Sequence, residues 1–87
     1  MERIDKILPT FRWEQIRAAA KTPLICVYDN PADYPGKYVA RLWDLQQPTG
    51  FVVVADSLEE VRAAIPDGMV QLARLGKDDP VIVETWI

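Results

Sequence analysis

Clusters of turn-forming residues divide most of the chain into short apolar segments, and this spacing constrains the fold more than any other feature of the sequence. The clusters contain proline, glycine, aspartate or asparagine and lie at residues 29–37, 46–50, 66–68 and 76–80. The segments between them are too short for the long helices of a bundle and suit the strands of a small sheet. With 87 residues, the chain has room for one such sheet and one modest core.

Five segments are predicted to form strands. Residues 24–28 and 51–55 are continuously apolar and rich in β-branched side chains, which is typical of buried strands. Residues 38–44 alternate instead, so that Arg41 and Trp43 share one face of their strand. The other two strands are predicted at residues 69–75 and 81–87.

Two helices are predicted before the first strand. A short one at residues 2–8 ends before Pro9, and a second runs over residues 11–21 with Thr10 as its cap. The residue before a proline is disfavoured in a helix, so Thr22-Pro23 ends the second helix. Its inward stripe is formed by Trp13, Ile16 and Ala20.

A third helix is predicted after the strand at residues 51–55. Either Asp56 or Ser57 offers an oxygen to the first free amides, and a glutamate follows three residues later in both registers, which is the pattern of a capping box. This helix extends to Ile65 and ends at Pro66. Its inward stripe is formed by Leu58, Val61 and Ile65.

These elements predict an α+β fold, with a single mainly antiparallel five-stranded sheet and helices on one face. The element order is α(α)-β-β-β-α-β-β. Residues 1–22 form an N-terminal helical segment and residues 23–87 a compact α+β domain, within one structural domain overall. The strands at residues 51–55 and 69–75, joined by the third helix, are expected to form a right-handed crossover with one parallel pair.

The composition excludes several kinds of catalysis. The chain contains no histidine, one cysteine and one serine, so a histidine base, a His/Cys zinc site and a Ser-His or Cys-His pair are all ruled out. No cofactor is expected. The net charge of −3 also disfavours nucleic acid as a partner, although residues 1–22 carry five basic and three acidic residues and form a basic front.

The sequence favours a cytoplasmic protein. No segment reaches the ~20 apolar residues of a membrane span, and the mixed charges at the N-terminus do not resemble a signal peptide. The lone Cys26 fits a reducing compartment and lies in an apolar run, which is typical of a buried structural thiol.

Three segments resemble a family of small uncharacterised bacterial proteins with no assigned activity. They are Val27-Tyr28-Asp29-Asn30-Pro31, the stretch from Asp33 to Asp44 (DYPGKYVARLWD) and Asp78-Asp79-Pro80-Val81-Ile82-Val83-Glu84, and the resemblance covers about residues 24–87. It implies a bacterial cytosolic protein and no mechanism. Separately, Val54-Ala55-Asp56-Ser57-Leu58-Glu59-Glu60 is similar to the start of the main helix in HicB-type antitoxin domains, although the helix is broken early at Pro66 and no C-terminal DNA-binding segment follows.

Aromatic and charged residues on two alternating strands suggest an interaction surface. Arg41 and Trp43 share a face of one strand, and Glu84 and Trp86 share a face of the last. If both faces lie on the helix-free side of the sheet, the four residues form one patch of the composition that interfaces favour. The alternative is that the tryptophans close the core. The last strand, if at an edge, also invites strand addition, with Glu84 limiting uncontrolled pairing.

The first long loop offers a second candidate site. Asp29, Asn30, Tyr34 and Tyr38 could rim a ligand pocket, because long loops with aromatic and polar groups often bind ligands. The alternative is structural, with the tyrosines attaching the loop to the edge of the sheet.

The acidic residues provide the one enzymatic alternative. Carboxylates converging at the sheet edge could hold Mg²⁺ in a hydrolase that uses carboxylates alone. No metal ligand is assigned, because aspartate also favours turns and helix caps. The candidates are Asp29, Asp33, Asp44, Asp56, Asp78 and Asp79.

The sequence therefore favours a non-catalytic protein-interaction module whose partner is another protein or a second copy in a weak homodimer. A HicB-like antitoxin or regulatory protein is the first alternative, and a carboxylate-only Mg-dependent hydrolase is the second.

Overall fold

The computed structural model of the chain describes residues 5–72 and 82–87. It confirms an α+β fold with a five-stranded, mostly antiparallel sheet. In chain order the elements are β1 (Lys6–Ile7), α1 (Trp13–Ala19), β2 (Pro23–Asp29), β3 (Tyr38–Asp44), β4 (Gln47–Ala55), α2 (Leu58–Ala63) and β5 (Ile82–Trp86).

The strands lie in the order β1-β4-β3-β2-β5, so the alternating strand β3 is at the centre. Strand β1 runs parallel to β4, and every other pair in the sheet is antiparallel. In the register Cys26 lies opposite Arg41, and Arg41 lies opposite Val52. Directly opposed residues point to the same side of a sheet, so these three side chains share one face.

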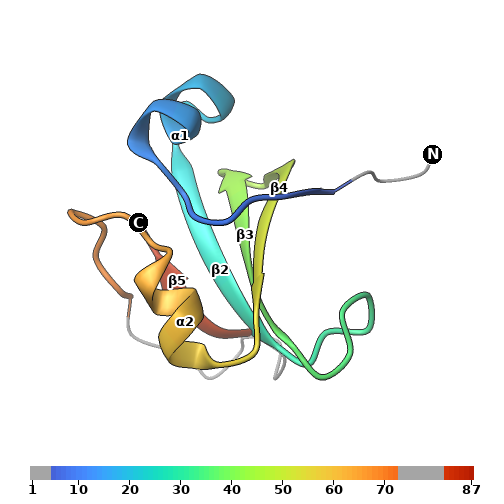
Figure 1. Ribbon diagram of the computed structural model, residues 1–87. Coiled ribbons are helices and arrows are strands. Elements are labelled where there is room, and N and C mark those ends of the chain that lie inside the picture. Colours follow the sequence, from blue (N-terminus) through green and yellow to red (C-terminus); the bar gives the residue numbers. More distant parts are fainter. Residues whose placement is uncertain (1–4, 73–81) are drawn as a thin grey trace.

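Both helices pack on the other face, as the sequence predicts (Figure 1). Ile16 of α1 and Val61 of α2 are fully buried in one core with the strand residues of that face. The strand residues of this core are Ile25, Val27, Ala40, Leu42 and Val53. In the described part of the chain, neither helix is long and apolar enough to cross a membrane.

The N-terminal cap predicted from the sequence is present in α2 and absent in α1. Ser57 caps α2 by accepting a hydrogen bond from the backbone N–H of Glu60, at 3.2 Å. Thr10 does not cap α1, which begins after Arg12 without a side-chain cap. The Thr10 hydroxyl instead donates to the carbonyl of Ala64, at 3.2 Å, and so ties the approach to α1 to the end of α2.

The short helix predicted at residues 2–8 is wrong where the structure describes it. Lys6 and Ile7 form β1 and pair with Phe51 and Val52 of β4. The apolar spacing that suggests a helix is overridden by backbone pairing along an open sheet edge, because tertiary contacts outweigh helix propensity in so short a segment.

The strand predicted at residues 69–75 is also largely wrong. Within the described residues only an isolated bridge forms there, between Gln71 and Trp86, and residues 73–75 lie outside them. The segment pairs antiparallel with β5 and not with β4, so the predicted crossover is absent and the parallel pair is β1–β4. Residues 70–72 hydrogen-bond to the chain at β5, so this short segment lies beyond β5 at that edge of the sheet.

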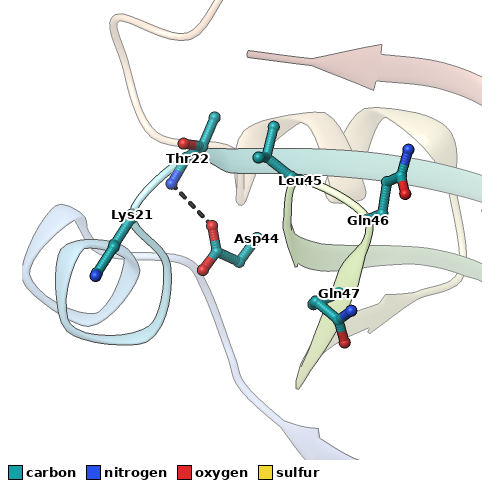
Figure 2. A pocket seen from close by; sticks show the side chains of 6 residues that line it. All are labelled: Lys21, Thr22, Asp44, Leu45, Gln46 and Gln47. Atoms are coloured by element: carbon teal, nitrogen blue, oxygen red, sulfur yellow. Dashed lines mark hydrogen bonds between the residues drawn. The ribbon is translucent and has the colours of Figure 1, made fainter.

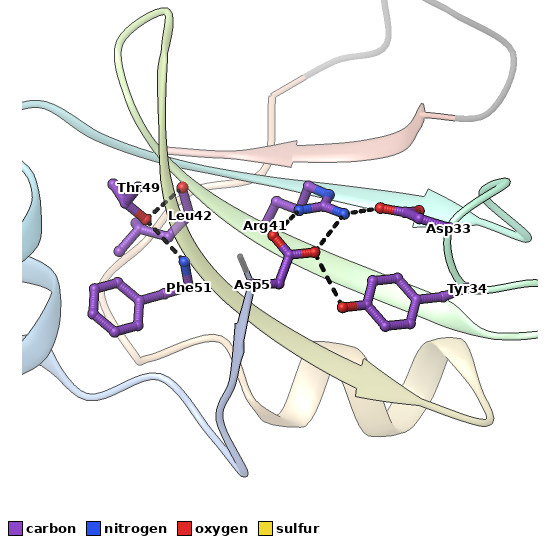
Figure 3. Close-up of polar contacts among 7 residues, drawn as sticks. All are labelled: Asp5, Asp33, Tyr34, Arg41, Leu42, Thr49 and Phe51. Carbon is purple, nitrogen blue, oxygen red and sulfur yellow. Dashed lines mark hydrogen bonds and ion pairs between the residues drawn. The ribbon is translucent and has the colours of Figure 1, made fainter. Parts of the chain in front are cut away.

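The turn between β3 and β4 is tighter than predicted. It consists of Leu45 and Gln46, and residues 47–50 belong to β4. Pro48 is tolerated because it lies near the sheet edge, beyond the two residues that β1 covers. The ladder shifts register after Arg41, and there the Thr49 hydroxyl donates to the Leu42 carbonyl at 2.8 Å (Figure 3).

Candidate functional site

One face of the sheet carries no helix among the described residues, and the central strand places an arginine in it. We call this the helix-free face. Its residues alternate along each strand with those that point into the core. Strands β2, β3 and β4 contribute Leu24, Cys26, Tyr28, Val39, Arg41, Trp43, Val52 and Val54. Arg41 is the charged residue on this face among the described strands, and only 6% of its surface is exposed.

Arg41 is held by two carboxylates from different parts of the chain (Figure 3). Its two terminal nitrogens donate to the two oxygens of Asp5, at 3.0 and 3.1 Å, in the bidentate geometry that suits arginine and carboxylate. It also pairs with Asp33, from the loop between β2 and β3. The Tyr34 hydroxyl donates to Asp5 at 3.1 Å. The cluster of Asp5, Asp33, Tyr34 and Arg41 thus joins the N-terminal segment, the loop and the central strand.

Burial makes this ion-pair cluster a structural necessity. The side chain of Arg41 is 7% exposed and that of Asp5 is 13% exposed, and an unpaired charge at such a depth is strongly destabilising. Burial alone lowers the pKa of Arg41, but the hydrogen bond and charge of Asp5 and the charge of Asp33 outweigh it, so the pKa is raised. Desolvation, followed by the hydrogen bond to Asp5, raises the pKa of Tyr34.

The loop between β2 and β3 folds toward the helix-free face and separates the residues that were expected to rim a pocket. Asn30, at φ 53°, accepts a hydrogen bond from the Gly36 N–H at 2.6 Å and so closes the loop on itself. Tyr34 reaches the Arg41 cluster, whereas Tyr38 packs on the core on the opposite side of the sheet. Asp29 is exposed at the end of β2. The four predicted residues therefore do not surround one cavity.

The structure also separates the four residues of the predicted interaction patch. Arg41 and Trp43 lie on the helix-free face, but Glu84 and Trp86 pair with Val27 and Ile25 and lie on the helix-covered face. The four residues therefore lie on two faces, because the register of β5 assigns its residues to the other side, which the alternation of β5 alone does not reveal.

Glu84 has a structural role under α2. It is 6% exposed and pairs with Arg62 of α2, and the indole N–H of Trp86 donates to it at 3.1 Å. The hydrogen bond to Glu84 raises the pKa of Arg62. Glu84 is therefore a buried, paired carboxylate and not the exposed residue that would limit strand pairing at the edge.

An apolar edge extends the helix-free face beyond β5. Val70 and Ile87 exchange two backbone hydrogen bonds, at 2.7 and 2.9 Å, and the Leu72 N–H donates to the Thr85 carbonyl at 2.8 Å. Because Gln71 lies opposite Trp86 on the helix-covered side, its neighbours point to the helix-free side. We call Val70, Leu72 and Ile87 the apolar edge.

These side chains are exposed although they are apolar. Val70 is 62%, Ile87 48% and Leu72 43% exposed, and Ile7, at the other edge of the same face, is 60% exposed. Of the five large hydrophobic residues that the described part of the chain exposes, Leu45 alone lies elsewhere, in the β3–β4 turn. Sequence reasoning missed this grouping. The alternation of residues 69–72 signals it, but only the pairing with β5 shows which face receives them.

Trp43 of β3 also belongs to the helix-free face. It is partly buried on the helix-free face opposite Leu24 of β2. Its indole nitrogen is buried and has no hydrogen-bond partner among the described residues. A buried donor without an acceptor costs about 1–3 kcal/mol, so the packing of the ring outweighs this cost.

Three of the aspartates considered as metal ligands have separate partners in the structure. Asp33 pairs with Arg41, Asp56 pairs with Lys37, and Asp44 accepts a hydrogen bond from the Thr22 N–H at 2.9 Å. Residues 5–72 and 82–87 hold no group of three acidic or cysteine side chains placed to bind a metal ion. Asp78 and Asp79 lie outside the described residues.

A shallow pocket lies at the end of the sheet where β2 begins and β3 turns into β4 (Figure 2). Its volume is about 500 Å³, and its lining comes from Lys21, Thr22, Asp44, Leu45, Gln46 and Gln47. All of these except Asp44 are exposed, and Asp44 is engaged with the Thr22 amide. The pocket thus offers solvated groups and no buried charge.

Comparison of the chain with protein-family models, with curated proteins and with solved structures found no match.

Proposed function

We propose that this protein is a non-catalytic interaction module that binds another protein chain through its helix-free face. The observation that carries the proposal is the exposure of three neighbouring apolar side chains at one edge of that face, with a fourth at the opposite edge. Ile7 and the apolar edge lie there, while the helices cover the other face. Isolated exposed hydrophobic residues are ordinary, but a group confined to one face is typical of a binding surface.

The charge distribution supports a protein as the partner. The arginine in this face is already neutralised by Asp5 and Asp33, so it is not available to bind phosphate. Nucleic acid and anionic membranes are both recognised by free basic groups. The apolar edge offers no free basic group and suits an apolar surface of a protein.

The Arg41 cluster contributes by making the surface rigid. It fixes the N-terminal segment and the loop against the central strand through hydrogen bonds to charged groups. A surface ordered before binding loses less conformational entropy when the partner arrives. We place this module in the cytoplasm, since its single cysteine fits a reducing compartment.

Gel filtration of extracts from the cells that produce the protein tests the proposal. Tagged wild-type chain at its native level should elute in a complex larger than its own 9.9 kDa. Val70→Glu should release the monomer, because a carboxylate in an apolar interface is desolvated without a partner.

Leu45→Glu is the matched control, since Leu45 is 59% exposed but lies away from the helix-free face. It should elute with the wild type. A wild-type chain that elutes as a monomer would contradict the proposal, and so would a complex that Val70→Glu leaves intact.

A further inference from the structure

We infer that the position of β1 beside β4 is a second binding site, which accepts an extended segment of another protein with an aspartate in the place of Asp5. Strand β1 is then the occupant that the chain itself supplies. This site lies at the edge of the sheet opposite the apolar edge, and the inference does not rest on the proposed function.

Three hydrogen-bond donors converge on one carboxylate at this site (Figure 3). They are the two terminal nitrogens of Arg41 and the hydroxyl of Tyr34, and Asp5 accepts from all of them. A carboxylate suits this arrangement because it has two acceptor oxygens and no donor. Asp33 already pairs with Arg41 from the loop, so the donors, and not net charge, select the second carboxylate. Because the side chain of Arg41 is 7% exposed, a segment that leaves these donors unpaired is strongly disfavoured.

Strand β1 is a replaceable occupant because it buries little besides Asp5. Its two residues are Lys6 and Ile7, and both are exposed, Ile7 by 60%. The side chains that fix the chain to the core come later, with Leu8 packed against the core and Phe11 3% exposed. Segments with few buried apolar contacts open at a low cost in free energy. Another extended segment can therefore replace residues 5–7 while the core stays intact.

Strand β4 offers an incoming segment more backbone than β1 uses. It has nine residues, and within the described chain β1 pairs only with Phe51 and Val52. The Leu8 N–H adds one hydrogen bond, to the Val52 carbonyl at 2.7 Å. None of the described strands pairs with residues 53–55 on that side. In strand addition, backbone hydrogen bonds give affinity and alternate side chains give specificity, so a longer segment gains affinity along β4.

The register sets the side-chain pattern of the segment. Ile7 lies opposite Val52, which is on the helix-free face. By alternation Asp5 shares this face with Ile7. Lys6 lies opposite Phe51 on the other face, with its ammonium group 5.8 Å from the centre of that ring. The segment that fits therefore has an aspartate, one intervening residue and then an apolar residue.

Peptide binding to the full chain carrying Asp5→Asn tests the inference, because this variant removes the native carboxylate from the site. The probe is the peptide of residues 1–8, MERIDKIL. Amide NMR titration should show binding below about 1 mM, with shifts at Tyr34, Arg41 and Val52.

Two control peptides test which feature of the segment is recognised. One carries Asp5→Asn, and the other carries Asp5→Lys together with Lys6→Asp. The second keeps the charge of the peptide but directs its carboxylate to the opposite face. Both should bind about tenfold or more weakly than MERIDKIL, because the donors of Arg41 and Tyr34 then lack their acceptor.

Two further variants of the full chain control for the state of the site. Asp56→Asn removes an exposed carboxylate and keeps β1 in place, so it should bind MERIDKIL about tenfold or more weakly than Asp5→Asn does, since the attached segment competes. Lys6→Pro is a second host, should Asp5→Asn fail to fold. The Lys6 N–H faces β4, because that of Leu8, two residues later, donates to β4, and proline lacks this N–H.

Each outcome decides the inference. Binding to either host that depends on the aspartate and on its position supports it. No binding to either host at about 1 mM shows that the site takes only the chain's own segment and overturns the inference. Equal binding of the three peptides, or equal binding by Asp56→Asn, places the contact elsewhere and also overturns it. The proposed function stands apart from these outcomes, because it is tested through Val70 at the opposite edge.

Discussion

Removal of the charge of Asp5 should destabilise the protein far more than a surface aspartate does. Asp5 accepts two hydrogen bonds from Arg41 and one from Tyr34. Asp5→Asn keeps the size of the side chain but points one amide N–H₂ at donor groups and leaves Arg41 with Asp33 alone. Breaking a buried ion pair from one side costs about 3–5 kcal/mol. Because Asp33 remains, we expect a loss of about 2–3 kcal/mol in the free energy of unfolding.

The magnitude is large for a chain of this size. A domain of 87 residues has a total stability of roughly 4–13 kcal/mol, so Asp5→Asn should lower the melting temperature by about 10–20 °C. Urea unfolding followed by tryptophan fluorescence measures the change, and an unaltered dependence on urea shows that the unfolding transition itself is unchanged.

Asp56→Asn is the matched control, with the same chemistry at the surface. Asp56 pairs with Lys37, and their side chains are 73% and 45% exposed. Exposed pairs contribute about 0–1 kcal/mol, so Asp56→Asn should be close to neutral. Equal effects of the two substitutions would refute the argument that burial makes the Arg41 cluster important.

Three further predictions concern local structure. Leu45→Gly should stabilise the protein by about 0.5–1 kcal/mol in urea unfolding, because Leu45 holds φ at 54° in a two-residue turn and its side chain is exposed; a loss of stability would contradict this. Ser57→Ala should cost about 1 kcal/mol, since Ser57 caps α2, and a neutral result by the same measurement would show that the cap is replaced by solvent. Tyr34 has a raised pKa, so its contribution is complete below the unfolded value of 10.0 and is lost as pH rises through the folded pKa. Tyr34→Phe should therefore reduce the fall in stability above that pH, and an unchanged alkaline profile would argue against the coupling.

Strands β2 to β5 and helix α2 were predictable because their signals are local. Strand β3 coincides with the predicted alternation at residues 38–44, and the cap at Ser57 follows from the spacing of serine and glutamate. Strand β1 was not predictable, since its two residues are extended only because β4 offers an open edge to pair with. Pairing over long sequence distances is not encoded in the periodicity of a short segment.

The same limit applies to the candidate site. Arg41 and Trp43 share a face by alternation alone, and the structure agrees. That Glu84 belongs to the other face depends on the register between β2 and β5, which includes a shift after Val27. A one-residue change in register reverses the face of every side chain in a strand. The pairing of Asp5 with Arg41 depends on β1 lying beside β4, and the apolar edge depends on residues 70–72 pairing with β5, so neither could be inferred from local periodicity.

Site-specific photo-cross-linking in the cells that produce the protein tests most directly whether the helix-free face meets another chain. A photoreactive amino acid is placed at Val70 or Ile7 on that face, and at Glu59 on the exposed side of α2. We predict discrete protein adducts from the first two positions and none from the third. Adducts from Glu59 alone, or equal adducts from all three positions, would contradict the assignment of the binding surface.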